Sequence, residues 1–160
     1  MVFKVVSKAL ANRLRGVMNS VIFDTQSAFI PSRVITDNVI VGFKCLHALK
    51  HKVKGKQGFL VVKLDMSKAY DQVEWDFQEG MMSCLGFSLG WIARVMNCVR
   101  SVSYSFLLNG EVFGSLRPSR GLRQGDPLSP YLFFIYAEGL SALFHRAVRE
   151  GSMAGFQCSR

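Results

Sequence analysis

The sequence lacks paired cysteines. Its four cysteines are widely scattered, and no Cys-x-x-Cys pair occurs: they are Cys45, Cys84, Cys98 and Cys158. This spacing argues against a disulfide framework and favours free thiols in a reducing, intracellular compartment. Cys45 lies close to His47 and His51, which share a helix face at i,i+4 spacing. Structural zinc sites use four ligands in tighter motifs, so a zinc site is the less favoured interpretation of this trio.

Long apolar runs and acidic residues are also scarce. No uncharged apolar run reaches about 18 residues, which argues against a transmembrane helix. The chain has 11 acidic and 20 basic residues, a net charge of +9 and a pI near 9.7. This excess favours an anionic partner, with nucleic acid ahead of an anionic membrane surface. Simple solubilising surface is the alternative.

The first 23 residues, "MVFKVVSKALANRLRGVMNSVIF", contain four basic residues and no acidic one. Such a stretch fits a mitochondrial transit peptide. It also fits an amphipathic helix over Lys4–Val21, which we favour. The apolar side of that helix is expected to carry Val5, Val6, Ala9, Leu10, Leu14 and Val17.

The length of 160 residues suits one domain or one large piece of a domain. An apolar fraction of 49% and a mean hydropathy of +0.20 are high for a small soluble domain. They indicate either a large core or surface that packs against further chain.

The hydrophobic pattern predicts helices mixed with a few strands. A strand is expected over 59–64, and a hairpin should turn at Asn109-Gly110, a strong type I′ signal. Further helices are expected from Thr36 or Asp37 to Lys52, over 73–84, over 89–99, and from Asp126 or Pro127 to Glu150. Because strands and helices do not alternate strictly, the predicted fold class is α+β.

The stretch "GFLVVKLDMSKAYDQVEW" ends its apolar run on Asp65. A carboxylate at a strand end, beside a turn, is a common way to hold Mg²⁺, which prefers oxygen ligands. The alternative is that Asp65 caps the following helix.

The stretch "GLRQGDPLSPYLF" places Gln124 between Gly121 and Gly125, in a loop that leads into a helix. Such a place offers backbone N–H groups to a phosphate or to the edge of a nucleotide. An ordinary loop before a capped helix is the alternative.

The two stretches resemble two signature blocks of reverse transcriptases from non-LTR (LINE-type) retrotransposons, most closely those of plants. "VSKALANRLRGVMNSVIFDTQSAFIPSRVITDNVIVGFKCLHALK" resembles the stretch that precedes them in that family. The resemblance runs from about Phe3 to Phe156. It implies a partial right-hand polymerase fold, with fingers-side helices in 1–57 and the palm strand, helices, hairpin and nucleotide-site loop in 58–160.

The resemblance also implies roles for single residues. Asp65 matches the first metal-binding aspartate, which helps to hold two Mg²⁺ ions, and Met66 would offer its backbone carbonyl. Tyr70 matches the aromatic residue beneath the incoming sugar, whose bulk rejects a 2′-OH. Gln124 and Gly125 match the loop against the incoming nucleotide. The implied partners are an RNA template, a DNA primer and deoxynucleoside triphosphates.

The family's second acidic cluster, an aromatic-x-Asp-Asp hairpin, has no counterpart here, because the sequence contains no Asp-Asp pair. Gln72 also stands where the family often has a basic residue, and Gly80 interrupts a helix. The basic segments Lys50–Lys56 and Arg117–Arg123 are candidate phosphate contacts by charge. We therefore expect a fragment that is inactive alone and exposes apolar surface through which it self-associates.

Three hypotheses follow. The first is an RNA-directed DNA polymerase domain whose missing parts lie outside this chain. The second is a decayed, non-catalytic relic with weak nucleic-acid binding. The third is an unrelated Mg²⁺-dependent phosphotransferase using Asp65. A haloacid-dehalogenase-like enzyme would have a second aspartate two residues later, and Ser67 stands there instead.

Overall fold

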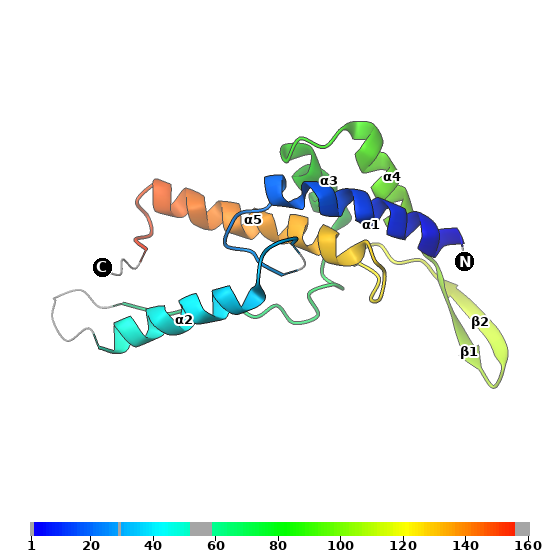
Figure 1. The fold of residues 1–160 in the computed structure, drawn as a ribbon. Coiled ribbons are helices and arrows are strands. Elements are labelled where there is room, and N and C mark those ends of the chain that lie inside the picture. Colours follow the sequence, from blue (N-terminus) through cyan, green and yellow to red (C-terminus); the bar gives the residue numbers. More distant parts are fainter. Residues whose placement is uncertain (1, 29, 52–58, 156–160) are drawn as a thin grey trace.

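The computed structural model describes residues 2–28, 30–51 and 59–155 (Figure 1). The basic link at 52–58 and Cys158 lie outside these ranges. Within them the elements follow in this order: α1 (Val2–Val21), α2 (Ile35–Lys50), α3 (Trp75–Cys84), α4 (Leu89–Arg100), β1 (Tyr104–Leu108), β2 (Glu111–Leu116) and α5 (Ser129–Arg149). Helices mixed with a small sheet agree with the expected α+β class.

Four helices build the core. α1 and α3 pack against α5, and α4 packs against both α1 and α3 (Figure 1). Their inward faces form one apolar cluster with Leu14, Met18, Met82, Val95 and Ile135 at its centre. Among the helices that the structure describes, none is both long enough and apolar enough to cross a membrane.

The amphipathic helix predicted at the N-terminus is confirmed, and Leu10 and Leu14 are buried as expected, but the rest of its predicted apolar side is wrong, and Ala9 is exposed. The buried stripe consists of Ser7, Leu10, Ala11, Leu14 and Met18, at helical spacing. Val5, Val6 and Val17 were expected on the apolar side and are exposed. Ser7 lies on this inner face as well, where its hydroxyl donates a hydrogen bond to the Asp126 carboxylate.

α5 owes its close contact with α3 to a glycine. A Cβ atom at Gly139 would lie 2.6 Å from Cζ of Phe77 and 3.3 Å from the sulfur of Met81. The Phe77 ring therefore occupies the space that a side chain would need, and it also meets the edge of the Tyr136 ring. The glycine that weakens α5 as a helix former is what lets α3 approach it.

The predicted strand at 59–64 is wrong. These residues are extended but lie in no strand, and their apolar side chains are exposed, with Leu60 at 87%. An extended segment becomes a strand only when a neighbour pairs with its backbone. In the described part of the chain the sheet has two strands, which pair with each other.

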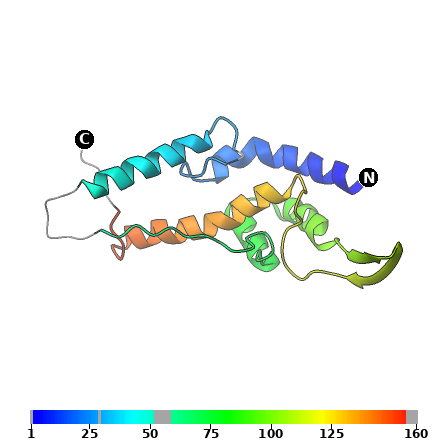
Figure 2. The ribbon, with the colours of Figure 1, turned by 90° about the horizontal axis from the view of Figure 1, so that it is seen from below.

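α2 stands apart from the core. It buries none of its residues and contacts no other described helix or strand. Figures 1 and 2 show it separated from α5 in both views, at the end of the molecule opposite the hairpin. Its apolar side chains, among them Val41 and Phe43, are consequently exposed.

The predicted hairpin is confirmed. β1 and β2 pair antiparallel around Asn109 and Gly110, whose φ angles of 52° and 88° are those of a type I′ turn. Every residue of both strands is exposed, because the hairpin projects from the helices (Figure 1).

Besides α1, which begins at Val2 rather than Lys4, three helix starts differ from the predicted ones. α2 begins at Ile35, after Val34, whose side chain makes no capping bond. α3 begins at Trp75 rather than Val73. α5 begins at Ser129, with Pro130 in its first turn, because the Asp126 carboxylate accepts the N–H of Leu128 and holds a separate turn before the helix.

Candidate functional site

Two segments that lie about fifty residues apart in the sequence are joined by three hydrogen bonds. The N–H of Leu122 donates to the carbonyl of Tyr70 at 2.8 Å, and the N–H of Gly121 donates to the carbonyl of Val73 at 2.8 Å. The indole N–H of Trp75 donates to the carbonyl of Gly121 at 2.8 Å. These bonds tie the turn after Asp65 to the loop that carries Gln124. They also explain why α3 begins after Val73, whose carbonyl is used in this junction.

The junction requires glycine at position 121. Gly121 has φ +91°, and a Cβ atom there would lie 3.3 Å from both Cα and the carbonyl oxygen of Asp71. The facing turn is closed by the N–H of Asp71 donating to the carbonyl of Lys68 at 2.9 Å. The backbones at Gly121 and Asp71 therefore lie so close together that a side chain at position 121 would crowd Asp71.

Tyr70 is half-buried at this junction. Its ring stacks on that of Phe133 from α5, with centroids 5.1 Å apart and an interplanar angle of 18°. Burial raises the pKa of the Tyr70 phenol. Two contacts therefore hold Tyr70 in place. Its ring stacks on α5, and its carbonyl accepts a hydrogen bond from the loop.

Asp65 and Met66 lie on the exposed extended segment that leads into this turn. Neither lines the two cavities described below. No three His, Cys, Asp or Glu side chains gather as a metal-binding cluster within the described residues. The carboxylates present therefore do not make a two-ion Mg²⁺ site, which needs a clamp on both the attacking and the leaving oxygen.

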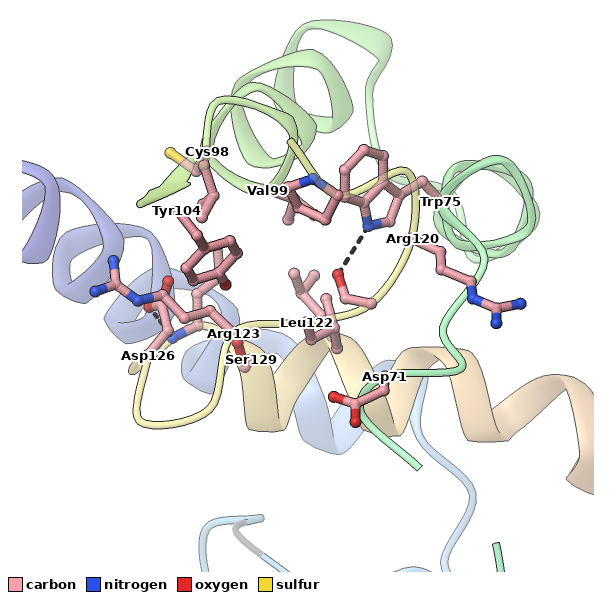
Figure 3. A pocket seen from close by; sticks show the side chains of 15 residues that line it. Asp71, Trp75, Cys98, Val99, Tyr104, Arg120, Leu122, Arg123, Asp126 and Ser129 are labelled. Atoms are coloured by element: carbon pink, nitrogen blue, oxygen red, sulfur yellow. Dashed lines mark hydrogen bonds between the residues drawn. The ribbon is translucent and has the colours of Figure 1, made fainter. Parts of the chain in front are cut away.

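The first cavity lies between the loop, α4 and α5 and has a volume of about 160 Å³ (Figure 3). Apolar groups such as Trp75, Val99 and Leu122 form its walls, and Arg120 reaches away from it toward Glu74, at 3.2 Å. The thiol of Cys98 also lines it, and burial, followed by the charge of Asp126, raises the pKa of that thiol. A raised pKa lowers the fraction of reactive thiolate, which argues against a role for Cys98 as a nucleophile.

The second cavity, of about 220 Å³, contains Gln124 and Gly125. Phe3 and Lys4 of α1 form its opposite side. Figure 3 shows the side chain of Arg123 extending from the loop toward α1, and its guanidinium carbon lies 5.7 Å from the centre of the Phe3 ring. Nothing in the linear pattern indicated that Lys4 and Gln124 would share a cavity, because this proximity depends on how α1 packs.

The structure thus brings some of the predicted residues together. The backbone of Tyr70 is joined to the loop, and Gln124 and Gly125 line one cavity beside it. Asp65 lies outside this cavity, on the exposed segment that precedes the turn. Lys50 is exposed at the end of α2, and Lys52–Lys56 lie outside the described residues.

The sequence of the chain is similar to those of reverse transcriptases and retrotransposon proteins. The sequence model of the family described as reverse transcriptase (RNA-dependent DNA polymerase) matches residues 1–159. The chain is 33% identical over 135 residues to the Pol polyprotein from the type-2 retrotransposable element R2DM of Drosophila melanogaster, covering 82% of the chain and 12% of that protein.

Two further relatives extend the likeness. An uncharacterized 149 kDa protein of transposon TX1 from Xenopus laevis is 28% identical over 144 residues, which is 90% of the chain and 11% of that protein. An uncharacterized mitochondrial protein of Arabidopsis thaliana is 54% identical over 54 residues, which is 34% of the chain and 44% of that protein. The chain therefore spans a minor part of the length of each of these relatives.

Proposed function

Because the chain belongs to the reverse transcriptase (RNA-dependent DNA polymerase) family, we propose that it forms part of an RNA-directed DNA polymerase of a non-LTR retrotransposon. The observation that carries the proposal is the junction of the two motif segments, which the bonds from Leu122 and Gly121 to Tyr70 and Val73 hold together. Its partners would be an RNA template, a DNA primer and deoxynucleoside triphosphates.

In this proposal the chain's own residues bind and orient the incoming nucleotide. The Gln124–Gly125 loop lies against it, and Tyr70 excludes a ribose 2′-OH from beneath the sugar. The stacking of Tyr70 on Phe133 and the bond from Leu122 support this role, because a steric filter must be held rigidly to discriminate.

Asp65 is proposed as a metal-binding carboxylate, with the carbonyl of Met66 beside it. One carboxylate on an exposed segment does not hold two divalent ions, because their mutual repulsion needs further negative charge to offset it. We therefore assign to this chain alone a part of the catalytic site and no complete reaction.

The finer placement is also a proposal. The helices of residues 1–57 would belong to the fingers and residues 58–160 to the palm of a right-hand polymerase. A plant-type element is part of the proposal, and the chain shares 54% identity over 54 residues with a protein of a plant, Arabidopsis thaliana. The exposed apolar side chains of α2 and the hairpin support self-association of the isolated chain.

Primer extension on an RNA template, with Mg²⁺ and deoxynucleotides, tests the function. The 160-residue chain is compared with a version extended through an aromatic-x-Asp-Asp hairpin, and each is also made as Asp65→Asn. We expect extension only by the longer version, and its loss on Asp65→Asn.

The matched control for this experiment is Asp76→Asn, which removes an exposed carboxylate of α3 and should leave extension unchanged. Extension by the 160-residue chain that depends on Asp65 would contradict the assignment of an incomplete site. A longer version that extends no primer would favour a non-catalytic relic.

A further inference from the structure

The cavity at Gln124 and Gly125 is lined by two cations from separate parts of the chain. Lys4 comes from the first turn of α1 and Arg123 from the loop. In the part of the chain that the structure describes, neither forms an ion pair. Two unpaired positive charges beside one cavity attract an anion, because an anion bound there breaks no existing ion pair of either cation.

The one anion in the cavity wall, Asp126, forms no ion pair with either cation within the described residues. The carboxylate of Asp126 accepts hydrogen bonds from the Ser7 hydroxyl and from the N–H of Leu128. It is thereby directed to α1 and to the turn before α5. With two cations and one anion in its lining, the cavity carries a net positive charge.

The Arg123 side chain and the helix that carries Lys4 are also held in place. Arg123 lies over the ring of Phe3, a cation–π arrangement that leaves the edge of its guanidinium free to donate hydrogen bonds. The bond from Ser7 to Asp126 fixes α1 to the loop one turn after Lys4. The guanidinium of Arg123 therefore does not have to be ordered when a ligand binds, which saves conformational entropy, whereas the exposed side chain of Lys4 is ordered by the ligand itself.

The size of the cavity restricts what it can take. Pockets for drug-sized ligands measure about 300–1,000 Å³. At about 220 Å³ this cavity is smaller, so it accommodates one group of a ligand whose remainder lies outside. Gly125 has no atom within 4 Å of where its Cβ would lie, so the loop backbone can be approached from that side.

We propose that Lys4 and Arg123, together with the Gln124–Gly125 loop, form a binding site for a phosphate group of a nucleotide substrate. This inference rests on the proposed function, which it extends by assigning a nucleotide-binding residue to α1. Arg123 suits a phosphate because its planar fork donates two parallel hydrogen bonds, and Lys4 adds a point charge.

The phosphate has two possible sources, an incoming nucleoside triphosphate or the backbone of a polynucleotide. Binding of deoxyadenosine triphosphate, of deoxyadenosine and of a short single-stranded oligonucleotide to the 160-residue chain at low salt separates them. The variants are Lys4→Gln, Arg123→Gln and Lys4→Arg. The matched control is Lys8→Gln, which removes an exposed charge one turn further along α1, outside the cavity.

We expect Lys4→Gln and Arg123→Gln each to weaken binding of the phosphate-bearing ligand by roughly 10-fold, the usual effect of losing a hydrogen bond to a charged group. Lys4→Arg should retain most of the affinity, Lys8→Gln should change it little, and deoxyadenosine should not bind. An effect confined to the triphosphate assigns the site to the incoming nucleotide, and one confined to the oligonucleotide assigns it to the backbone.

Equal effects of Lys4→Gln and Lys8→Gln would overturn the inference, as would a chain that binds neither phosphate-bearing ligand. The outcome is distinguishable from failure of the proposed function, which is read from Asp65-dependent extension. A chain whose longer version extends no primer, but whose triphosphate binding depends on Lys4 and Arg123, would retain the phosphate site.

Discussion

Among single residues, Glu138 combines a charge with almost complete burial. Its side chain in α5 is 3% exposed, and its Oε2 atom has no hydrogen-bond partner within the described residues. Burial raises the pKa of Glu138 above its ordinary value of 4.5, although the backbone N–H of Phe23 and the charges of His145 and Arg33 act in the opposite direction. The folded protein therefore holds this proton to a higher pH than the unfolded chain does.

This pKa predicts the sign of a pH effect on stability. An acid whose pKa is raised by folding contributes most stability below its unfolded pKa, and that contribution is lost as the pH rises through the folded pKa. We expect Glu138→Gln to be more stable than the native chain at pH 7, and this difference to shrink as the pH falls toward 4.5. Urea unfolding at several pH values measures it.

The control for this prediction is Glu150→Gln, which removes an exposed carboxylate that pairs with Arg146 at 2.7 Å. Its effect should be small, because exposed ion pairs contribute little. A Glu138→Gln variant that is less stable than the native chain at pH 7 would show that the ionised carboxylate is stabilised in the fold.

At the level of elements, α3 and α5 each contain a glycine, and the two glycines differ in the space around them. The space that a Cβ atom of Gly139 in α5 would need is occupied by the Phe77 ring. Gly80 in α3 has no atom within 4 Å of where its Cβ would lie. Both weaken their own helix by the same backbone entropy. What differs is the space available, which the sequence does not reveal.

We expect Gly139→Ala to destabilise the protein by about 1–3 kcal/mol, because its Cβ would force the α3 and α5 helices apart. Gly80→Ala is the matched control and should stabilise it by about 0.5–1 kcal/mol, since alanine is the better helix former and meets no neighbour. Thermal unfolding of both variants measures the difference. Equal shifts of the same sign would show that α3 and α5 do not pack in this register.

At the level of the whole molecule, the net charge of +9 predicts sequence-independent binding to nucleic acid. Affinity for a labelled RNA–DNA hybrid should fall by more than roughly 10-fold between about 50 and 200 mM salt, because bound phosphates release their counterions. A peptide nucleic acid duplex of the same sequence, which lacks phosphates, is the control and should not bind. Binding that ignores salt would count against an electrostatic interface.

The exposed apolar surface predicts association of the isolated chain with itself. Leu60 on the extended segment and Leu107 on β1 are 87% and 73% exposed. Sedimentation should show oligomers that grow with concentration, and Leu60→Lys with Leu107→Lys should reduce them. Asn97→Lys adds the same charge at an exposed polar residue of α4 and should have little effect, because it removes no apolar surface. A monomer at every concentration would contradict the prediction.

The sequence by itself determined the local structure and the family resemblance. The helical period predicted α1, α3, α4 and α5 to within a few residues, and Asn109-Gly110 located the hairpin turn. These features depend on residues close together in the chain, so a linear pattern contains them. The two motif stretches likewise indicated the family that the match over residues 1–159 shows.

Only the tertiary structure decided which distant groups meet. It left residues 59–64 outside the described sheet, turned Ser7 of α1 toward Asp126, and placed Lys4 in the cavity of Gln124. Apolar periodicity shows that a helix has an inner face but does not specify which loop lies at its end. Strand formation and shared cavities depend on partners far along the chain, and packing alone brings those partners together.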